Sequence, residues 1–267
     1  MQKNYCGDLV RKHDENRYLI SMFAPADRRA DLWALFAFNY EIAKTRDVVS
    51  DTTLGLIRLQ WWRDAIRGVY DGSGVPDHEV LKPLSVAIDK YKLPQEYFDK
   101  LIYAREFDLE GVSPESLSGL ISYADFTTTP LLCLAMRICG YDLDDDYIRP
   151  IAVNYTLAGI LMATAHNARQ GHVLLPTDLM NKYGLTLDSL FKEEGQVGLA
   201  SLVKDVVEGR LTDCDANGYP LLKSCVAISD INFSSIVSNR YMVMSPILQR
   251  PPAFKVLRVF WKVKCCN

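Results

Sequence analysis

The chain has 267 residues, of which 49% are hydrophobic and 24% are charged, and its formal net charge is −3. This composition is typical of a globular protein with a sizeable buried core, and it excludes disordered and fibrous proteins. Because the overall charge is slightly acidic, we expect no nucleic acid among the partners.

The cysteine pattern and the start of the chain bear on its location. Seven cysteines are scattered without a C-x-x-C pair, which argues against a disulfide framework and against a structural zinc site. The chain does not open with a basic segment followed by an apolar one, so no cleaved export signal is expected. Together these features predict free thiols and a cytoplasmic location.

The first strong helix signal lies in residues 25–43, where apolar side chains occupy nearly every helical face. This pattern predicts a helix that is buried almost all round. Helical geometry puts Asp47 and Asp51 one turn apart on the same face. Two carboxylates placed in this way can share Mg²⁺ and, through it, a diphosphate. The alternative is an ordinary solvated patch that Lys44 and Arg46 neutralise.

A second helix is predicted to begin with Thr52 or Thr53 as its N-cap and to end at the turn around Gly72. It contains the adjacent Trp61 and Trp62. Aromatic residues at helical spacing usually pack in a core.

Helix signals also dominate the middle of the chain. Further helices are predicted to start at Pro94 and at residues 113–115, and Gly140 closes a helix that contains residues 131–138. No segment shows sustained strand alternation, and no glycine-rich phosphate loop occurs, so Rossmann and P-loop folds are excluded. The sequence therefore predicts an all-α protein.

Residues 150–168 form an uncharged stretch whose length is close to that needed to span a bilayer. The stretch contains polar residues, including Asn154, Thr164, His166 and Asn167. A buried helix of a soluble protein fits this composition better than a membrane span.

The C-terminal part of the chain is basic. No acidic residue follows Asp230, whereas six basic residues do. Their mixture with aromatic and aliphatic residues suits a helix that lies on an anionic membrane surface. The alternative is a last helix that packs on the core and exposes a solvated charged face. The mixed residues are Arg250, Phe254, Lys255, Leu257, Arg258, Phe260, Trp261, Lys262 and Lys264.

Several short segments, taken together and in this order, indicate a particular fold. No single one of them would suffice. They are Tyr18-Leu19-Ile20, residues 23–29, residues 35–38, Trp61-Trp62-Arg63, Tyr123-Ala124 and residues 173–176. In these segments the chain resembles the squalene/phytoene synthase family. The resemblance implies an all-α, isoprenoid (terpenoid) synthase-like helical bundle around a central cavity, formed by residues 1–267 as a single domain.

Members of that family join two prenyl diphosphates head to head. The reaction needs two opposed aspartate-rich faces, because Mg²⁺ must neutralise the leaving diphosphate while a dry aromatic cavity protects the carbocation. The resemblance therefore makes Asp47 and Asp51 candidate Mg²⁺ ligands. This chain departs from the pattern, however, because two of the family's first-face aspartates fall on Ala43 and Lys44 and only Asp47 matches.

The second face departs further from the family pattern. Its two aspartate positions fall on Ala163 and Asn167, and the stretch around them contains no carboxylate. Arg169 would instead contact a diphosphate directly, which makes it a candidate diphosphate-binding residue. Trp61, Trp62 and Asn167 are candidate residues of the cavity.

The segment with Phe38-Asn39 before Asp47, and the small-residue turn at Ala163-Thr164, resemble one branch of the family. That branch contains the mitochondrial complex I assembly factor and its bacterial relatives, and it is regarded as non-catalytic in the head-to-head sense. The resemblance implies a binding or respiratory complex assembly protein with depleted catalytic aspartates. Its expected partners are a prenyl diphosphate or lipid in the cavity, a respiratory-complex subunit, and the inner membrane, at which the protein would be peripheral.

The alternative hypothesis is a Mg²⁺-dependent prenyltransferase that condenses two prenyl diphosphates head to head, with squalene or phytoene synthase activity in isoprenoid biosynthesis. In that case Asp47 and Asp51 bind Mg²⁺, and Arg169 compensates on the other face for the missing carboxylates.

Overall fold

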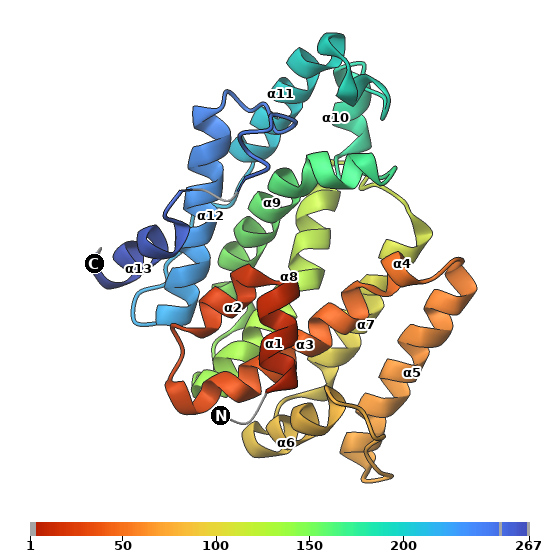
Figure 1. Ribbon diagram of the computed structural model, residues 1–267, viewed down its shortest axis with the longest axis vertical. Helices are drawn as coiled ribbons and strands as arrows, with labels where there is room; N and C mark the ends of the chain where they lie inside the picture. Colours follow the sequence, from red (N-terminus) through yellow and green to blue (C-terminus); the bar gives the residue numbers. More distant parts are fainter. Residues whose placement is uncertain (1–3, 251–252, 266–267) are drawn as a thin grey trace. The chain divides into compact units, whose positions relative to one another are not determined.

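The computed structural model describes residues 4–250 and 253–265, and the regular elements in this part of the chain are helices (Figure 1). No strand occurs among these residues. The all-α class predicted from the sequence is confirmed.

Contacts divide the chain into two compact units, which are described separately. Unit 1 comprises residues 1–112 and 126–148, and unit 2 comprises residues 113–125 and 149–267. Two long helices, α8 (Leu117–Cys139) and α9 (Asp145–Arg169), contribute residues to both units. The organisation of residues 1–267 as a single domain around a central cavity stays a prediction.

Unit 1 is built around α3, whose residues are buried on nearly all sides, as the sequence predicted. The Phe38 ring of α3 meets the rings of Trp62 and Phe98 edge to face, each at a centroid distance of 5.4 Å. α3 packs against α1, α2, α6 and α7. The helices of this unit, besides its part of α8, are α1 (Tyr5–His13), α2 (Glu15–Ser21), α3 (Arg29–Ala43), α4 (Thr45–Val48), α5 (Thr52–Asp71), α6 (Leu81–Tyr91) and α7 (Gln95–Glu110).

Several helix boundaries lie where the sequence predicted them. α5 ends at Gly72, which has φ 69°, and α8 is followed by Gly140, which has φ 93°. Such left-handed backbone angles favour glycine, because glycine has no Cβ atom to clash. α7 begins directly after Pro94.

The predicted helix start at residues 113–115 is wrong, because α8 begins at Leu117. The carbonyl groups of Pro114 and Glu115 accept hydrogen bonds from the backbone N–H groups of Thr177 and Asp178, at 2.9 and 3.0 Å. These long-range bonds hold the segment in a non-helical conformation that its local sequence does not reveal.

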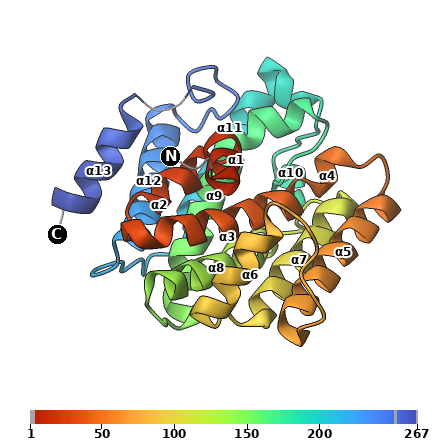
Figure 2. The same ribbon diagram turned by 60° about the horizontal axis from the view of Figure 1, so that its bottom comes forward.

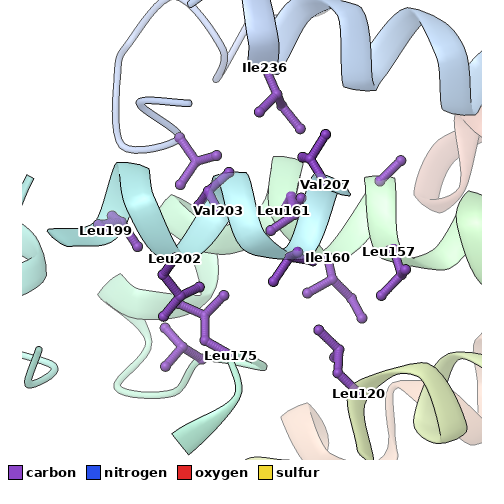
Figure 3. Close-up of a cluster of buried hydrophobic side chains, with 14 of the residues drawn as sticks. Leu120, Leu157, Ile160, Leu161, Leu175, Leu199, Leu202, Val203, Val207 and Ile236 are labelled. Atoms are coloured by element: carbon purple, nitrogen blue, oxygen red, sulfur yellow. The ribbon is translucent and has the colours of Figure 1, made fainter. Parts of the chain in front are cut away.

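Unit 2 has its own apolar core, in which side chains of α9 and α11 point toward one another (Figure 3). Leu157 and Leu161 of α9 and Leu202 and Val203 of α11 are fully buried there, together with Leu175 from the loop after α9. The other helices of unit 2 are α10 (Thr177–Lys182), α11 (Glu193–Glu208), α12 (Pro220–Ser238) and α13 (Lys255–Cys265).

Two helices, α9 and α12, are long and apolar enough to cross a membrane. In their most apolar windows, 67% of the α9 residues and 61% of the α12 residues are buried inside the protein. Burial of this extent is what core helices show, and it fits the expectation of a buried helix over residues 150–168.

A matched pair of glycine substitutions tests the close approach of α11 to Ser189. A Cβ atom at Gly195 would lie 2.1 Å from the Ser189 carbonyl oxygen, whereas one at Gly159 would meet nothing beyond its own helix within 4 Å. Because alanine is favoured over glycine by about 1 kcal/mol within a helix, Gly159→Ala should raise the free energy of unfolding by up to about that amount. We expect Gly195→Ala to lower it by about 1–3 kcal/mol.

Urea denaturation followed by circular dichroism measures both changes in the free energy of unfolding. Equal effects of the two substitutions would contradict the close approach of Gly195 to Ser189.

Candidate functional site

The segment that carries Asp47 and Asp51 is not one continuous helix. α3 ends at Ala43, Asp47 lies in the four-residue α4, and Val49 has extended backbone angles (φ −107°, ψ 149°). The prediction that the two aspartates lie one turn apart on one helical face is therefore wrong. Both side chains are exposed.

Asp51 is the N-cap of α5, a role that the sequence had suggested for Thr52 or Thr53. Its carboxylate accepts a hydrogen bond from the backbone N–H of Leu54 at 3.0 Å. An aspartate here satisfies one of the free N–H groups of the first turn and lies at the positive end of the helix dipole. This carboxylate thus has a local structural role that is independent of any metal.

In residues 4–250 and 253–265, no three His, Cys, Asp or Glu side chains come together in a way that could hold a metal ion. Mg²⁺ usually takes one or two carboxylates together with the phosphates of a substrate. Mg²⁺ binding by Asp47 and Asp51 therefore stays a prediction, without a preformed site to support it.

A carboxylate that the sequence analysis missed, Glu41, lies buried near the end of α3. Its Oε1 atom pairs with Lys44 Nζ at 2.6 Å, and its Oε2 atom pairs with Arg58 Nη2 at 2.8 Å. The two cations neutralise the carboxylate and occupy both of its oxygens. We call these three residues the Glu41 cluster. A polar residue on a helix that is apolar almost all round was the signal that could have found it, because buried charges require partners.

Tyr40 lies beside the Glu41 cluster. Its ring stacks on His13 at a centroid distance of 4.7 Å, and Lys44 Nζ lies 5.1 Å from its centre. Burial raises the pKa of the Tyr40 hydroxyl, and the negative charges of Glu41 and Asp47 raise it further. The hydroxyl therefore stays protonated at neutral pH, as a donor rather than an anion.

A buried cation, Arg105 of α7, lies next to Asn39. Its Nη1 atom pairs with Asp108 at 3.0 Å, and its Nη2 atom donates a hydrogen bond to Asn39 Oδ1 at 3.4 Å. Within the part of the chain that the structure describes, three buried polar atoms here form no hydrogen bond, namely Thr45 Oγ1, Arg58 Nε and Arg105 Nε. The region is thus rich in positive charge and hydrogen-bond donors.

The two candidate cavity tryptophans have different surroundings. Trp62 is 1% exposed and packs on Phe38 and on His78, the latter at 5.0 Å between ring centres. Trp61 is 41% exposed and lies 5.5 Å from His78. Trp62 is therefore a core residue of unit 1, and lining of a ligand cavity by either ring stays a prediction.

The two candidates from the second aspartate face lie at the C-terminal end of α9, in unit 2. Asn167 is partly buried, and its backbone carbonyl accepts hydrogen bonds from the N–H groups of Gln170 and His172 at 2.9 and 3.2 Å. Arg169 is exposed. Diphosphate binding by Arg169 and a cavity role for Asn167 are not tested by these contacts and stay predictions.

Unit 2 also contains two adjoining pockets, of about 230 and 200 Å³, that the sequence analysis missed. They lie where α12 meets the loop over residues 210–217, and Cys214 and Asp230 line both. Asn154 holds this loop with two hydrogen bonds to the backbone of Leu211, at 2.7 and 3.0 Å. Neither pocket includes Asn167 or Arg169.

Comparison with known proteins gives a consistent family assignment. The sequence model described as squalene/phytoene synthase matches residues 10–216. The chain is 31% identical over 205 residues to "NADH dehydrogenase (ubiquinone) complex I, assembly factor 6" of Bos taurus, and 30% identical over 206 residues to the protein of that name from Homo sapiens. Each of these matches covers 76% of this chain and 61% of the relative, so the chain spans about three fifths of the relatives' length.

A phytoene synthase is a more distant relative. Over 238 residues the chain is 21% identical to chloroplastic phytoene synthase 2 of Zea mays, with 82% of this chain and 59% of that protein covered.

Among solved structures, squalene synthase HpnC from Alicyclobacillus acidocaldarius matches with a TM-score of 0.76 and 19% identity, covering 88% of this chain and 93% of that chain. A dehydrosqualene synthase in complex with a ligand matches with a TM-score of 0.76 and 17% identity, covering 97% and 94%. At such low identity these matches establish the fold alone, and they confirm the isoprenoid synthase-like class predicted from the sequence.

Two charge-neutralising substitutions compare how much the buried carboxylate of Glu41 and the exposed carboxylate of Asp47 contribute to the free energy of unfolding. We expect Glu41→Gln to lower the free energy of unfolding by about 1–3 kcal/mol, because Arg58 and Lys44 lose their partner; their partial exposure to water limits the cost. Asp47→Asn should change it by less than about 0.5 kcal/mol, as is usual for an exposed site. Urea denaturation of both variants measures the difference.

A double-mutant cycle between Glu41→Gln and Arg58→Gln supplies the control. A coupling energy below about 0.5 kcal/mol would contradict the pairing described above.

Proposed function

The chain belongs to the squalene/phytoene synthase family, and we propose that it is a member with depleted catalytic carboxylates that acts as a binding or assembly protein for a respiratory complex. The observation that carries this proposal is the loss of paired carboxylates. Asp47 lies in α4 whereas Asp51 caps α5, and residues 161–169 contain no acidic side chain.

Head-to-head condensation depends on neutralising two diphosphates with a cluster of metal ions, which needs acidic side chains on both faces. The buried carboxylate nearest the first face, Glu41, already has both oxygens paired with Lys44 and Arg58. Exchanging these cations for Mg²⁺ would remove the carboxylate partner of both basic side chains, and the buried Nε atom of Arg58 already forms no hydrogen bond. The site thus favours binding over ionisation of a diphosphate.

The proposed partners follow from the relatives and from the basic side chains. Proteins 30–31% identical to this chain carry the name of a complex I assembly factor, which supports a respiratory-complex subunit as the partner. A prenyl diphosphate or another lipid phosphate is the proposed small ligand, with the exposed Arg169 as one contact. A respiratory assembly protein works beside a membrane. We therefore propose that this chain is cytoplasmic and lies peripherally at the inner membrane.

The second candidate function, a Mg²⁺-dependent prenyltransferase, is favoured by the match to a phytoene synthase and by the exposed Asp47 and Asp51. Purified full-length protein incubated with Mg²⁺ and farnesyl or geranylgeranyl diphosphate distinguishes the two. We expect no squalene, phytoene or cyclopropyl precursor. A squalene synthase assayed in parallel serves as the positive control. Mg²⁺-dependent product that disappears in Asp47→Asn would overturn the non-catalytic proposal.

A second test asks whether the cellular role needs these aspartates. In cells lacking the gene, we expect the wild-type chain and the Asp47→Asn, Asp51→Asn double variant to restore the assembled respiratory complex equally. Asparagine is also a good N-cap, so the double variant should keep the start of α5 intact. Native gel electrophoresis measures the amount of complex, and failure of the double variant alone would point to metal-dependent chemistry instead.

A further inference from the structure

The last helix, α13, is fixed to α12 along a narrow strip. Val259 and Val263 are 0% and 7% exposed, and they face α12, with which α13 makes most of its contacts. Lys262 Nζ forms an ion pair with Asp230 of α12 at 2.9 Å. Figures 1 and 2 both show α13 beside α12. One side of the helix is therefore already occupied by the protein.

The side of α13 that points away from α12 is apolar. Leu257, Phe260 and Trp261 are between 52% and 65% exposed. In a helix on the surface of a globular protein, the outward side is ordinarily polar. We call these three residues, together with the exposed Arg258 and Lys264, the outer face of α13.

The outer face also has a one-sided charge. Arg258 and Lys264 are exposed, and no acidic residue follows Asp230 in the chain. An acidic side chain that could neutralise these cations is thus absent from α13 itself. Aromatic and aliphatic side chains combined with cations are what an interfacial helix needs, since the rings enter the boundary of the acyl chains while the cations meet anionic headgroups.

We infer that the outer face of α13 docks on an anionic lipid bilayer, with the helix axis parallel to the surface. With 11 residues, the helix is about 16 Å long and too short to span a bilayer. The inference deepens the proposed function, because it names the membrane contact of a protein that works beside a respiratory complex. The sequence left two alternatives for this helix, packing on the core and lying on a membrane. They are compatible, because they use opposite sides of the helix.

Co-sedimentation with vesicles tests the inference on the full-length chain. We expect the protein to bind vesicles of phosphatidylglycerol mixed with phosphatidylcholine at low salt, to be released as salt rises, and to bind pure phosphatidylcholine at least about tenfold more weakly. The Leu257→Glu, Trp261→Glu double variant should lose at least about tenfold in affinity, because it removes two inserting side chains and adds two negative charges. Neither residue belongs to the strip that packs on α12.

Val197→Glu provides the matched control, because Val197 is an apolar residue of α11, 76% exposed and outside α13. It should bind vesicles as the wild type does. Trp261→Phe should retain binding but lose the tryptophan quenching that brominated lipids cause, which reports insertion of this side chain directly. Circular dichroism melting curves verify that each variant is folded.

Two results would overturn the inference: wild-type protein that does not bind the anionic vesicles, or a Leu257→Glu, Trp261→Glu variant that binds them as well as the wild type. The first result would indicate that the outer face binds a protein partner instead of a bilayer. The outcome is separate from that of the proposed function, because restoration of the respiratory complex by the chain is measured without vesicles.

Discussion

The first half of the candidate site depends on one electrostatic constraint, the burial of Glu41 on a helix that is apolar almost all round. A carboxylate removed from water is stable as an anion only if cations and donors replace its hydration. Lys44 and Arg58 meet this need with contacts of 2.6 and 2.8 Å. They come from the end of α3 and from α5, so the same contacts help to fix how these two helices approach each other.

The constraint also makes the region rich in positive charge. Besides Lys44 and Arg58, Arg105 places another cation beside Asn39. Asp51, which could have contributed to a metal site, caps α5. The helix break at residues 44–51 therefore separates Asp47 from Asp51 and places Asp51 at the start of α5.

In unit 2 the same helix that carries Asn167 and Arg169 contributes to the core. Leu161 and other apolar side chains of α9 are buried there (Figure 3). The exposed cations of this unit include Arg169, at the end of α9, and Arg258 and Lys264 of α13. These are the side chains to which the proposed contacts with phosphate groups and lipid headgroups are assigned.

The sequence by itself determined the all-α class, the family, the burial of α3 and the glycine-ended helices, because these depend on local periodicity, on turn conformation and on the order of short motifs. It also determined the absence of acidic residues around Asn167 and after Asp230.

The positions of Asp47 and Asp51 became known only from the folded structure. Periodicity would have continued the helix, but Val49 is extended and the Asp51 carboxylate accepts the capping hydrogen bond from Leu54. Tertiary structure likewise decided the start of α8, where hydrogen bonds from Thr177 and Asp178 hold a segment distant in sequence. Pairing of Glu41 with Arg58, 17 residues away, is of the same kind: a sequence shows that a buried charge needs a partner, but only the folded chain selects which one.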